Sequence, residues 1–598
     1  MTFQIALVLI LVTITSALLI SERLRPDLVA LLLLIVLGLS GLVTPLEMFS
    51  GFSRPAVITI LSIFVITAAL EHTGASRALG QQLNRLAGDS EPRAVLVVMI
   101  ATALLSLVMN NIAAAAVLLP AAIGISKQTA IRPSKLLIPL AFASNLGGMA
   151  TLYATANILV SAVLVDQGLA AYRLLDFLPV GLPMALAGIL FVALVGRRWL
   201  PSHAVGGQPG PNRRTGGLSE TYGLTSSVSG VYVKPGSDMA GLSLADGHWS
   251  QRFGVNVVAI SRGNRLELAP VVEAEVLAGD VVVFTGQADR DVLSDHGLVP
   301  TNDPAWHGQF TSDQVSLVEV TLPPRSGIAG KTLRDINFRS KFNLSVIALW
   351  REGNTLQHKL IDMPLRFGDA LLVQGQRDRI NLLRQEPDFL ILDEDVHPVA
   401  SPRKAILAVA LMLLAVGLPV ANLLPIAEAA FTVAWLMVLL GCLTMDEAYG
   451  SVEWRAIFLI AAMLPLGIAL TNSGAAALIG GQLVRTLGTW GPLAVAAGIY
   501  LVTMLLTQVM GGPATAVVLT PIAIAAARQV GVDPRGMAMA VAMGCSTVFL
   551  TPFAHASNLL VMGPGGYRFK DYARVGLPLS LVLFVVFLIT LPWFWHIR

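Results

Sequence analysis

The amino-acid sequence predicts an α-helical polytopic membrane protein with two inverted-topology repeats and an inserted cytoplasmic α+β tandem domain. Three observations lead to this fold class. First, 55% of the 598 residues are hydrophobic, 13% are charged and the mean hydropathy is +0.71, which excludes a soluble globular chain. Second, an apolar stretch with polar interruptions occurs twice. Third, a long polar segment separates the two copies, whereas several apolar runs reach the ~20 residues of a membrane helix.

The duplicated stretch lies at residues 109–161 and again at residues 510–562, and the copies align without a gap, so that Asn157 coincides with Asn558. Two shorter similarities flank it in the same order along the chain. Agreement at three separate places indicates an internal duplication. The shorter pairs are LEHTGAS (70–76) with LTNSGAA (470–476), and AYRLLDFLPVGLP (171–183) with GYRFKDYARVGLP (566–578).

The predicted elements follow the same layout in the first repeat (1–200) and in the second (401–598). One segment in each repeat is divided in the middle, and we expect it to form a re-entrant hairpin, which leaves five membrane helices per repeat. The hairpins are expected at about 94–127 and 490–528. The other apolar segments lie near 3–20, 28–44, 55–72, 134–165 and 174–195, and near 405–420, 425–442, 454–471, 535–562 and 573–595.

Topology follows from this count, because five crossings are an odd number and give the two repeats opposite orientation. With residues 199–402 in the cytoplasm, the inner loops carry most of the lysine and arginine side chains, as the positive-inside rule requires. These loops also account for the net charge of +3 without a nucleic-acid partner. The alternative, in which the divided segments are full crossings, spoils this parity.

The polar segment between the repeats is itself duplicated. GLSLADGHWSQRFGVNVVAISRGN (241–264) resembles GKTLRDINFRSKFNLSVIALWREGN (330–354), and each is followed by Gly-Asp, a β-type run and Gly-Gln-x-Asp-Arg. Alternating β-branched runs with short polar helix patterns predict two α+β modules, within 201–300 and 301–400. Residues 201–225 are expected to form a flexible linker at the start of the first module.

Paired, interrupted hydrophobic segments in two halves indicate the binding site of a secondary transporter. Unpaired backbone groups inside a membrane are tolerated where they line a polar cavity. Helix N-termini suit an anion, and unwound carbonyls with Ser, Thr or Asn oxygens suit sodium. The chain offers these groups at Asn110 and Asn111, at Gly511, Gly512 and Pro513, in a first helix break at Gly147, Gly148, Thr151, Thr155 and Asn157, and in a second at Ser546, Thr547, Thr551, Pro552, Ser557 and Asn558.

Structural roles remain open for several of these residues. Gly147 and Gly148 also fit close helix packing, and Ser or Thr hydroxyls also bond their own helix backbone. Asn157 and Asn558 are stronger candidates, because both copies keep an amide that is costly in lipid. His555 is an alternative proton group. The spans around the breaks contain no Asp, Glu, Lys or Arg, which favours coupling to sodium over coupling to protons.

The paired hairpins, SNLGGMATLYATANILVSAVL and FLTPFAHASNLLVMGPGGYRFKDYARVGLPL resemble the divalent anion/sodium symporter family of the ion-transporter superfamily. The similar branch carries two TrkA-C modules, the C-terminal regulatory modules of potassium-channel gating rings, between its halves. The resemblance covers nearly the whole chain. It implies a homodimeric elevator-type transporter of sulfate or di- and tricarboxylates in a bacterial inner membrane. The TrkA-C modules imply dimerisation or the sensing of a small regulatory ligand, and a structural insert without a ligand is the alternative.

The resemblance also implies a Ser-Asn-Thr triplet at each hairpin tip for sodium and substrate. Asn110-Asn111-Ile112 keeps the central Asn of the first triplet, whereas Gly511-Gly512-Pro513 has none of the three side chains. We therefore expect one well-formed cation site, with the second copy giving mainly backbone to the anion. The predicted substrate-binding residues are Asn110, Asn111, Thr151, Thr155, Asn157, Gly511, Gly512, Thr551, Pro552, Ser557 and Asn558. The predicted sodium-binding residues are Ser106, Asn110, Asn111, Gly147, Gly148, Thr507 and Ser546.

These expectations combine into a sodium-coupled symporter for a small divalent anion, with sodium as the coupling ion and no other cofactor. Sulfate is favoured over C4-dicarboxylates because no basic residue is available for a second carboxylate. A channel or ion permease gated by the TrkA-C pair is the alternative, but the sequence has no TVGYG-like filter. No enzymatic activity is predicted, because the spans offer no nucleophile–base pair and no metal-ligand cluster.

Overall fold

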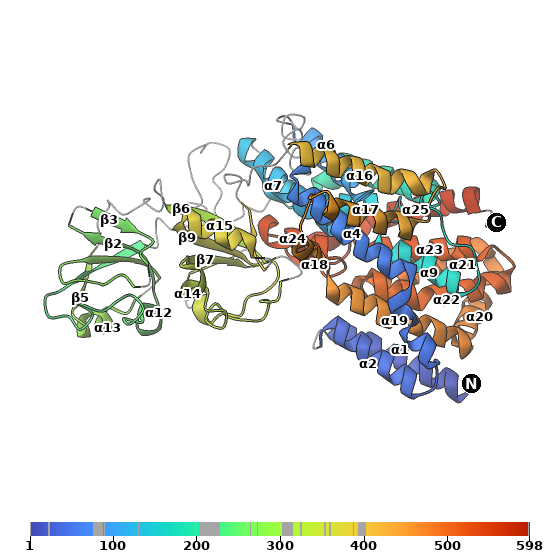
Figure 1. The fold of residues 1–598 in the computed structure, drawn as a ribbon, viewed down its shortest axis with the longest axis horizontal. Coiled ribbons are helices and arrows are strands. Elements are labelled where there is room, and N and C mark those ends of the chain that lie inside the picture. The colour runs from blue at the N-terminus through green and yellow to red at the C-terminus, as the bar shows by residue number, and fades with distance from the viewer. Residues whose placement is uncertain are drawn as a thin grey trace.

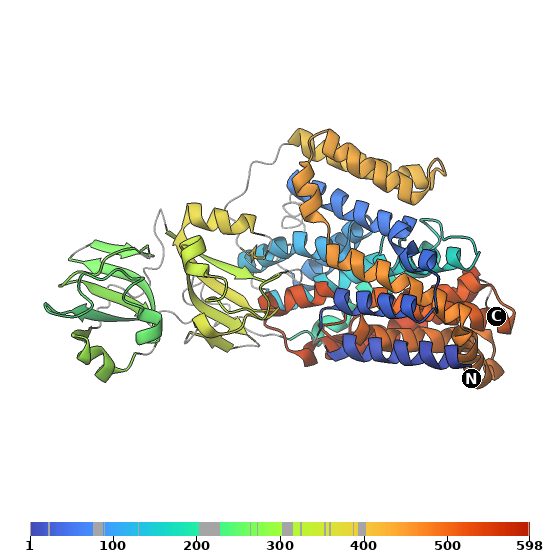
Figure 2. The same ribbon diagram turned by 60° about the horizontal axis from the view of Figure 1, so that its bottom comes forward.

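The computed structural model of the chain consists of a helical part and two β-sheets, which lie beyond one end of the helices in both views (Figures 1 and 2). The first and last described helices, α1 and α25, both belong to the helical part. The structure describes residues 2–21, 24–75, 88, 90–129, 131–201, 228–263, 265–271, 273–286, 288–301, 315–322, 326–351, 354–357, 360–386, 388–392, 402–595 and 597. The expected linker therefore lies outside the described residues, except for Pro201.

The helices form two series in the same order, except that α20 of the second series has no counterpart among the described residues of the first. The first series is α1 (Phe3–Ser21), α2 (Pro26–Leu39), α3 (Pro45–Ser50), α4 (Pro55–His72), α6 (Glu91–Ser106), α7 (Asn111–Gln128), α8 (Leu137–Gly148), α9 (Thr155–Asp166) and α10 (Leu178–Leu194). The second series is α16 (Pro402–Val420), α17 (Ile426–Leu439), α18 (Met445–Ser451), α19 (Trp454–Asn472), α20 (Ala475–Leu487), α21 (Pro492–Met510), α22 (Gly512–Val530), α23 (Pro534–Ser546), α24 (Ala556–Gly565) and α25 (Phe569–Trp595).

The outer faces of these helices are apolar. Leu39 on α2 is 85% exposed and Ile406 on α16 is 71% exposed, and α16 lies at the edge of the helical part (Figure 2). Soluble proteins rarely expose apolar surface on this scale, whereas lipid accommodates it. Six helical segments in the described part of the chain are long and apolar enough to cross a membrane. The prediction of an α-helical polytopic membrane protein is confirmed at this level.

Helices α4 and α19, which correspond in the two series, run in opposite directions. The short helices α3 and α18 precede them, and both begin with a capping box of Thr and Glu. Glu47 of α3 accepts a hydrogen bond from Asn472 at the end of α19 (3.5 Å). Glu447 of α18 lies 3.4 Å from His72 at the end of α4. The start of each helix therefore lies beside the end of the other.

The similarity between residues 171–183 and 566–578 also corresponds to reciprocal contacts. The Tyr172 hydroxyl donates to the carbonyl of Arg535, in the first turn of α23. The Tyr567 hydroxyl donates to the carbonyl of Ser134, just before α8 (2.8 Å), and accepts from the Ile138 backbone N–H (3.0 Å). Each tyrosine thus binds the broken helix of the other half. The repeated motif serves to join the two halves.

The two sheets have the same strand order. The first is β3-β2-β4-β1-β5 and the second is β8-β7-β9-β6-β10, with antiparallel pairs throughout. The strands are β1 (Val228–Val233), β2 (Asn256–Arg262), β3 (Arg265–Leu268), β4 (Val281–Thr285), β5 (Leu298–Thr301), β6 (Val315–Thr321), β7 (Ser345–Arg351), β8 (Asn354–Leu356), β9 (Ala370–Gln376) and β10 (Leu390–Ile391). The helices are α12 (Trp249–Arg252), α13 (Arg290–Asp295), α14 (Phe338–Phe342) and α15 (Arg377–Gln385).

Equivalent ion pairs fix equivalent turns in these two modules. Arg262, at the end of β2, binds Asp280 (3.0 Å), and hydrogen bonding to that carboxylate raises the pKa of Arg262. Arg351, at the end of β7, binds Asp369 (2.6 Å). Apolar side chains of both sheets form one buried cluster, which includes Val258 and Ile347. The duplication of the middle segment is thus present in strand order, turn and ion pair alike.

Candidate functional site

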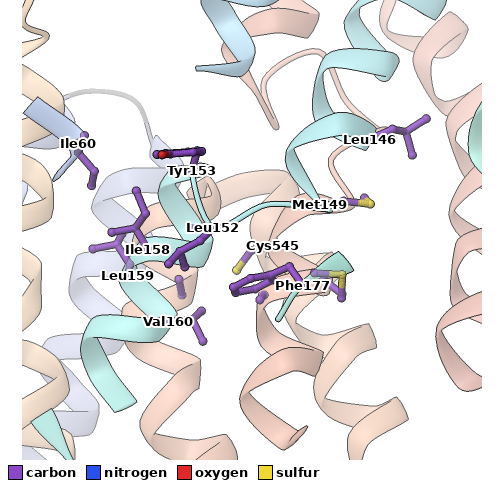
Figure 3. Close-up of a cluster of buried hydrophobic side chains, with 14 of the residues drawn as sticks. Ile60, Leu146, Met149, Leu152, Tyr153, Ile158, Leu159, Val160, Phe177 and Cys545 are labelled. Carbon is purple, nitrogen blue, oxygen red and sulfur yellow. The ribbon is translucent and has the colours of Figure 1, made fainter. Parts of the chain in front are cut away.

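The two helix breaks lie beside each other because the broken helices are packed in opposite directions, α8 against α24 and α9 against α23. The rings of Phe142 on α8 and Phe549 in the second break are 4.9 Å apart. Figure 3 shows the first break, where the chain runs without helical turns through Met149, Leu152 and Tyr153. All three side chains are buried. The backbones of both breaks therefore lie in one common interior region.

A glycine of the shared Val-Gly-Leu-Pro motif lies against each break. A Cβ atom at Gly181 would lie 2.1 Å from the Met149 carbonyl oxygen, and one at Gly576 would lie 2.0 Å from the Phe549 carbonyl oxygen. Any side chain at either position would overlap the backbone of the break. Helices α10 and α25 thus support the two unwound stretches in the same way.

A chain of side-chain hydrogen bonds connects the first hairpin tip with the second break. The Ser106 hydroxyl donates to Asn111 Oδ1 (2.7 Å), and Asn111 Nδ2 donates to Asn145 Oδ1 (3.2 Å). Asn145 Nδ2 donates to Ser557 Oγ (3.2 Å), which lies 2.8 Å from His555 Nδ1. All of these groups lie in apolar surroundings, where an unmade hydrogen bond costs about 1–3 kcal/mol. The network therefore holds tip and break in one arrangement.

Asn157 and Asn558 occupy equivalent places after the two breaks and are completely buried. Asn157 Nδ2 donates to two carbonyls of the first break (3.2 and 2.7 Å). Asn558 Nδ2 donates to two carbonyls of the second break (2.7 and 3.2 Å). The Oδ1 atom of each has no hydrogen-bond partner among the described residues. Each asparagine thus shapes its break and keeps one oxygen available for a cation or a donor.

The second hairpin tip has no polar side chain. Gly511 has φ +77°, a backbone conformation that glycine adopts without strain. A Cβ atom at Gly512 would lie 3.4 Å from the Cys545 carbonyl oxygen and 3.6 Å from the Ala156 Cβ atom. The start of α22 therefore lies against the start of α9, with room for one methyl group.

Gln508 connects this second hairpin to the second break. Its Nε2 donates to the carbonyls of Thr547 (2.8 Å) and Met504 (3.0 Å), and its Oε1 accepts from the Leu550 backbone N–H (3.1 Å). The Thr551 hydroxyl donates to the Gln508 carbonyl (3.2 Å). The carboxamide thus satisfies a donor and an acceptor that the unwound backbone would otherwise leave unpaired.

Four half-helix N-termini lie in two pairs beside the two breaks. The start of α7 is joined to the start of α24 through Asn145, and the start of α22 touches the start of α9. These helices have 18, 10, 19 and 12 residues. A helix N-terminus offers free N–H groups and about half a positive charge. The region therefore favours an anion even though the residues that line it include no Lys or Arg side chain.

The predicted site residues divide into three groups in the structure. Ser106, Asn111, Gly148 and Ser557 lie around the hydrogen-bonded chain, where a Cβ atom at Gly148 would lie 2.6 Å from Asn111 Oδ1. Other predicted residues make local contacts: Asn110 caps α7 by accepting from Ile112 N–H, Thr151 accepts from Tyr153 N–H, Thr507 and Ser546 bond their own helices, and Gly147 fits against the Ala103 backbone. The rest lie at the breaks and the second tip: Thr155, Asn157, Gly511, Gly512, Thr551, Pro552 and Asn558.

Two polar residues of the site, Asn145 and Gln508, were not predicted from the sequence. Each lies inside an apolar helix and forms hydrogen bonds with residues of other segments. The available signal is that a buried amide in a membrane helix is costly and requires partners. The same cost argument that selected Asn157 could therefore have selected Asn145 and Gln508.

Comparison with known proteins places this site in context. A family model described as CitMHS, citrate transporter, matches residues 16–544. The chain is 34% identical over 610 residues to the uncharacterized transporter YfbS of Escherichia coli (strain K12), with 99% of each chain covered. It is 32% identical over 600 residues to an uncharacterized transporter of Synechocystis sp., covering 97% and 95%. It is 22% identical over 767 residues to sodium/sulfate cotransporter 2 of Chlamydomonas reinhardtii, covering 93% and 86%.

Proposed function

This chain belongs to the CitMHS citrate transporter family, and we propose that it is a sodium-coupled symporter for a small divalent anion, with sulfate ahead of dicarboxylates. It is a multi-pass integral membrane protein and a transporter, since its family and relatives are transporters and not enzymes. The observation that carries the proposal is that two pairs of half-helix N-termini lie beside uncharged oxygens at the two breaks.

The anion is held, in this proposal, by backbone N–H groups and amide donors in place of basic side chains. Helix N-termini bind compact anions such as sulfate and phosphate in this way. A dicarboxylate would bring its second charge to a region without a Lys or Arg partner, which is unfavourable in a medium of low dielectric. The similarity to a protein named sodium/sulfate cotransporter 2 supports the same order of preference.

The sodium ion is proposed to bind beside the first hairpin tip. Asn111 Oδ1, Ser106 Oγ and the Ser144 carbonyl oxygen lie within one hydrogen-bonded group, in which Ser106 reaches both of the other oxygens (2.7 and 2.6 Å). Oxygen atoms of this kind suit a hard cation. At the second tip, Gly511 and Gly512 bring no oxygen-bearing side chain. We therefore propose one sodium site, next to an anion site that uses backbone from both halves.

Transport is proposed to follow an elevator-type alternation. The opposite directions of α4 and α19 support two inverted repeats, with residues 199–402 in the cytoplasm of a bacterial inner membrane. Both hairpins and both broken helices would form the moving part, and α1, α2, α4, α16, α17 and α19 the fixed part. The equal strand order of the two sheets supports a tandem of two similar domains between the membrane repeats, which we propose to be TrkA-C domains.

The test is uptake by the purified protein in proteoliposomes. Labelled sulfate and labelled succinate are offered separately, with an inward sodium gradient and with a potassium gradient in its place. We expect saturable sulfate uptake that requires sodium, and weaker uptake of succinate. If neither anion moves under a sodium gradient, the proposal fails. Flux that ignores sodium and does not saturate would instead support the gated channel.

A further inference from the structure

The second α+β module, formed by residues 315–392, touches the helical part at α24. A Cβ atom at Gly563, near the end of α24, would lie 2.0 Å from the Gly368 carbonyl oxygen in the turn before β9. Gly368 has φ +86°, a conformation that favours glycine. Figure 1 shows α24 next to this module. The two backbones approach so closely that neither side has a side chain between them.

The turn that makes this contact is held rigidly. Arg351 binds the Asp369 carboxylate (2.6 Å), and the Arg366 backbone N–H donates to the same carboxylate (2.7 Å). The remaining space along the contact is about 30 Å³, and Met562 and Tyr567 line its helical side. A cavity of this size holds at most a few water molecules. The contact is therefore a closed joint and not a cleft for a small ligand.

On the helical side, the joint lies at the far end of the half-helix that carries the site. Ser557 and Asn558 are at the start of α24, and Gly563 follows five residues later, about 7.5 Å along the axis. Tyr567, just beyond, holds the start of α8 through Ser134 and Ile138. A displacement of the Gly368 turn would therefore be transmitted to both broken helices, α24 and α8.

The same module also reaches a helix of the other group. A Cβ atom at Gly327 would lie 3.7 Å from the Arg455 guanidinium, in the first turn of α19. Leu390 and Leu392, at the end of the module, pack on the apolar cluster of the helical part. The module thus contacts α24 and α19 at once.

We propose that the second α+β module is a brake on transport, which in this structure fastens α24 to the start of α19. The inference rests on the proposed function, because it requires α24 to move relative to α19. For the moving part to cross the membrane, the Gly368 turn must leave Gly563. Any signal that draws the module away would then raise the transport rate, although the module lies outside the site.

A reversible cross-link tests the brake. A Cβ atom at Gly368 would lie 3.6 Å from the Met562 Cβ atom, within the Cβ–Cβ range of a disulfide. The full-length Gly368→Cys/Met562→Cys variant is assayed oxidised and after dithiothreitol, with each single variant as a control. We expect uptake to fall at least about 10-fold on oxidation and to recover on reduction, as for a gating step. Formation of the disulfide is verified by peptide mass spectrometry, because Gly368 has φ +86° and a side chain there is strained. Equal uptake in both states of the cross-linked protein would overturn the brake.

A second readout does not depend on the transported ion. Cys545, one of two native cysteines, is buried next to the second hairpin, and its alkylation by N-ethylmaleimide is followed by peptide mass spectrometry. We expect slower alkylation in the cross-linked protein, and faster alkylation than wild type in Gly563→Ala, whose methyl group excludes the docked turn. Unchanged alkylation in both would overturn the brake. Cross-link-sensitive alkylation without any sodium-driven anion uptake would overturn the proposed function alone.

Discussion

The two hairpin tips occupy equivalent places in the duplicated chain but present different chemistry. At the first tip, Asn111 takes part in a chain of side-chain hydrogen bonds that reaches the second break. At the second tip, Gly511 and Gly512 present only backbone, and Gln508, three residues earlier, makes the polar contacts. The duplication has kept the backbone of breaks and helix starts and has varied the side chains. In the proposed function, this difference separates an anion site built from both halves from a cation site built from one.

The largest effect is expected from the amide at the first tip. Asn111→Ala removes the proposed sodium ligand and leaves Ser106 and Asn145 without their shared partner. We expect sodium-dependent uptake to fall about 100-fold, equivalent to roughly 2.7 kcal/mol, with normal protein levels in the membrane. Gly512→Ala is the matched control, since its methyl group fits at 3.4 Å or more from all neighbours. A larger loss of uptake in Gly512→Ala than in Asn111→Ala would contradict the proposed asymmetry of the two tips.

The next largest effect is expected at Gln508. Gln508→Ala leaves the Leu550 N–H and the Thr547 carbonyl without their partner in the second break. We expect maximal sulfate uptake to fall about 10-fold, because a buried unpaired group costs about 1–3 kcal/mol, while the sodium concentration for half-maximal uptake stays the same. The measurement is a sodium titration at saturating sulfate. A change confined to sodium affinity would indicate that the cation binds at the second tip.

Asn145 tests whether the two halves act through one network. Asn145→Ala removes the link between Asn111 at the start of α7 and Ser557 at the start of α24, and it leaves both of those side chains in place. We expect uptake to fall about 10-fold and sodium affinity to weaken, since a residue that orients a ligand typically contributes about 10–100-fold. Uptake and sodium affinity equal to wild type would show that the first tip acts alone.

The smallest effect is expected from the tyrosines that join the halves. Tyr567→Phe removes the hydroxyl that binds Ser134 and Ile138, and Tyr172→Phe removes the bond to Arg535. Each change is expected to destabilise the detergent-solubilised protein by about 1 kcal/mol and to leave sodium affinity unchanged. Thermal unfolding followed by intrinsic fluorescence measures the loss. An altered sodium affinity would place these joints within the site.

Much of the fold could be predicted because it is written in local patterns. Apolar runs of helix length, the repeated Val-Gly-Leu-Pro motif and the alternating strands of the middle segment need no tertiary information. The capping boxes at Thr44 and Thr444, 400 residues apart, are also local patterns, but they were not predicted. They carry the Thr-x-x-Glu signature of a helix start.

The site was predictable only in part, because its contacts join segments far apart in the chain. Asn145 and Ser557 are separated by 412 positions, and Gln508 reaches a break some 40 residues away. No local spacing indicates such pairs. Asn110 was predicted as a ligand of sodium and substrate. In the structure its side chain caps α7, because a side chain at the start of a helix meets unpaired N–H groups there.

The stoichiometry of sodium tests the asymmetry of the two tips most directly. Wild-type proteoliposomes are titrated with sodium at fixed sulfate, and fluxes of labelled sodium and labelled sulfate are measured together. One site at the first tip predicts a Hill coefficient of about 1 and one sodium ion carried per sulfate. A coefficient near 2, retained as two ions per sulfate, would contradict the account, because it requires a second cation site where the chain offers glycines.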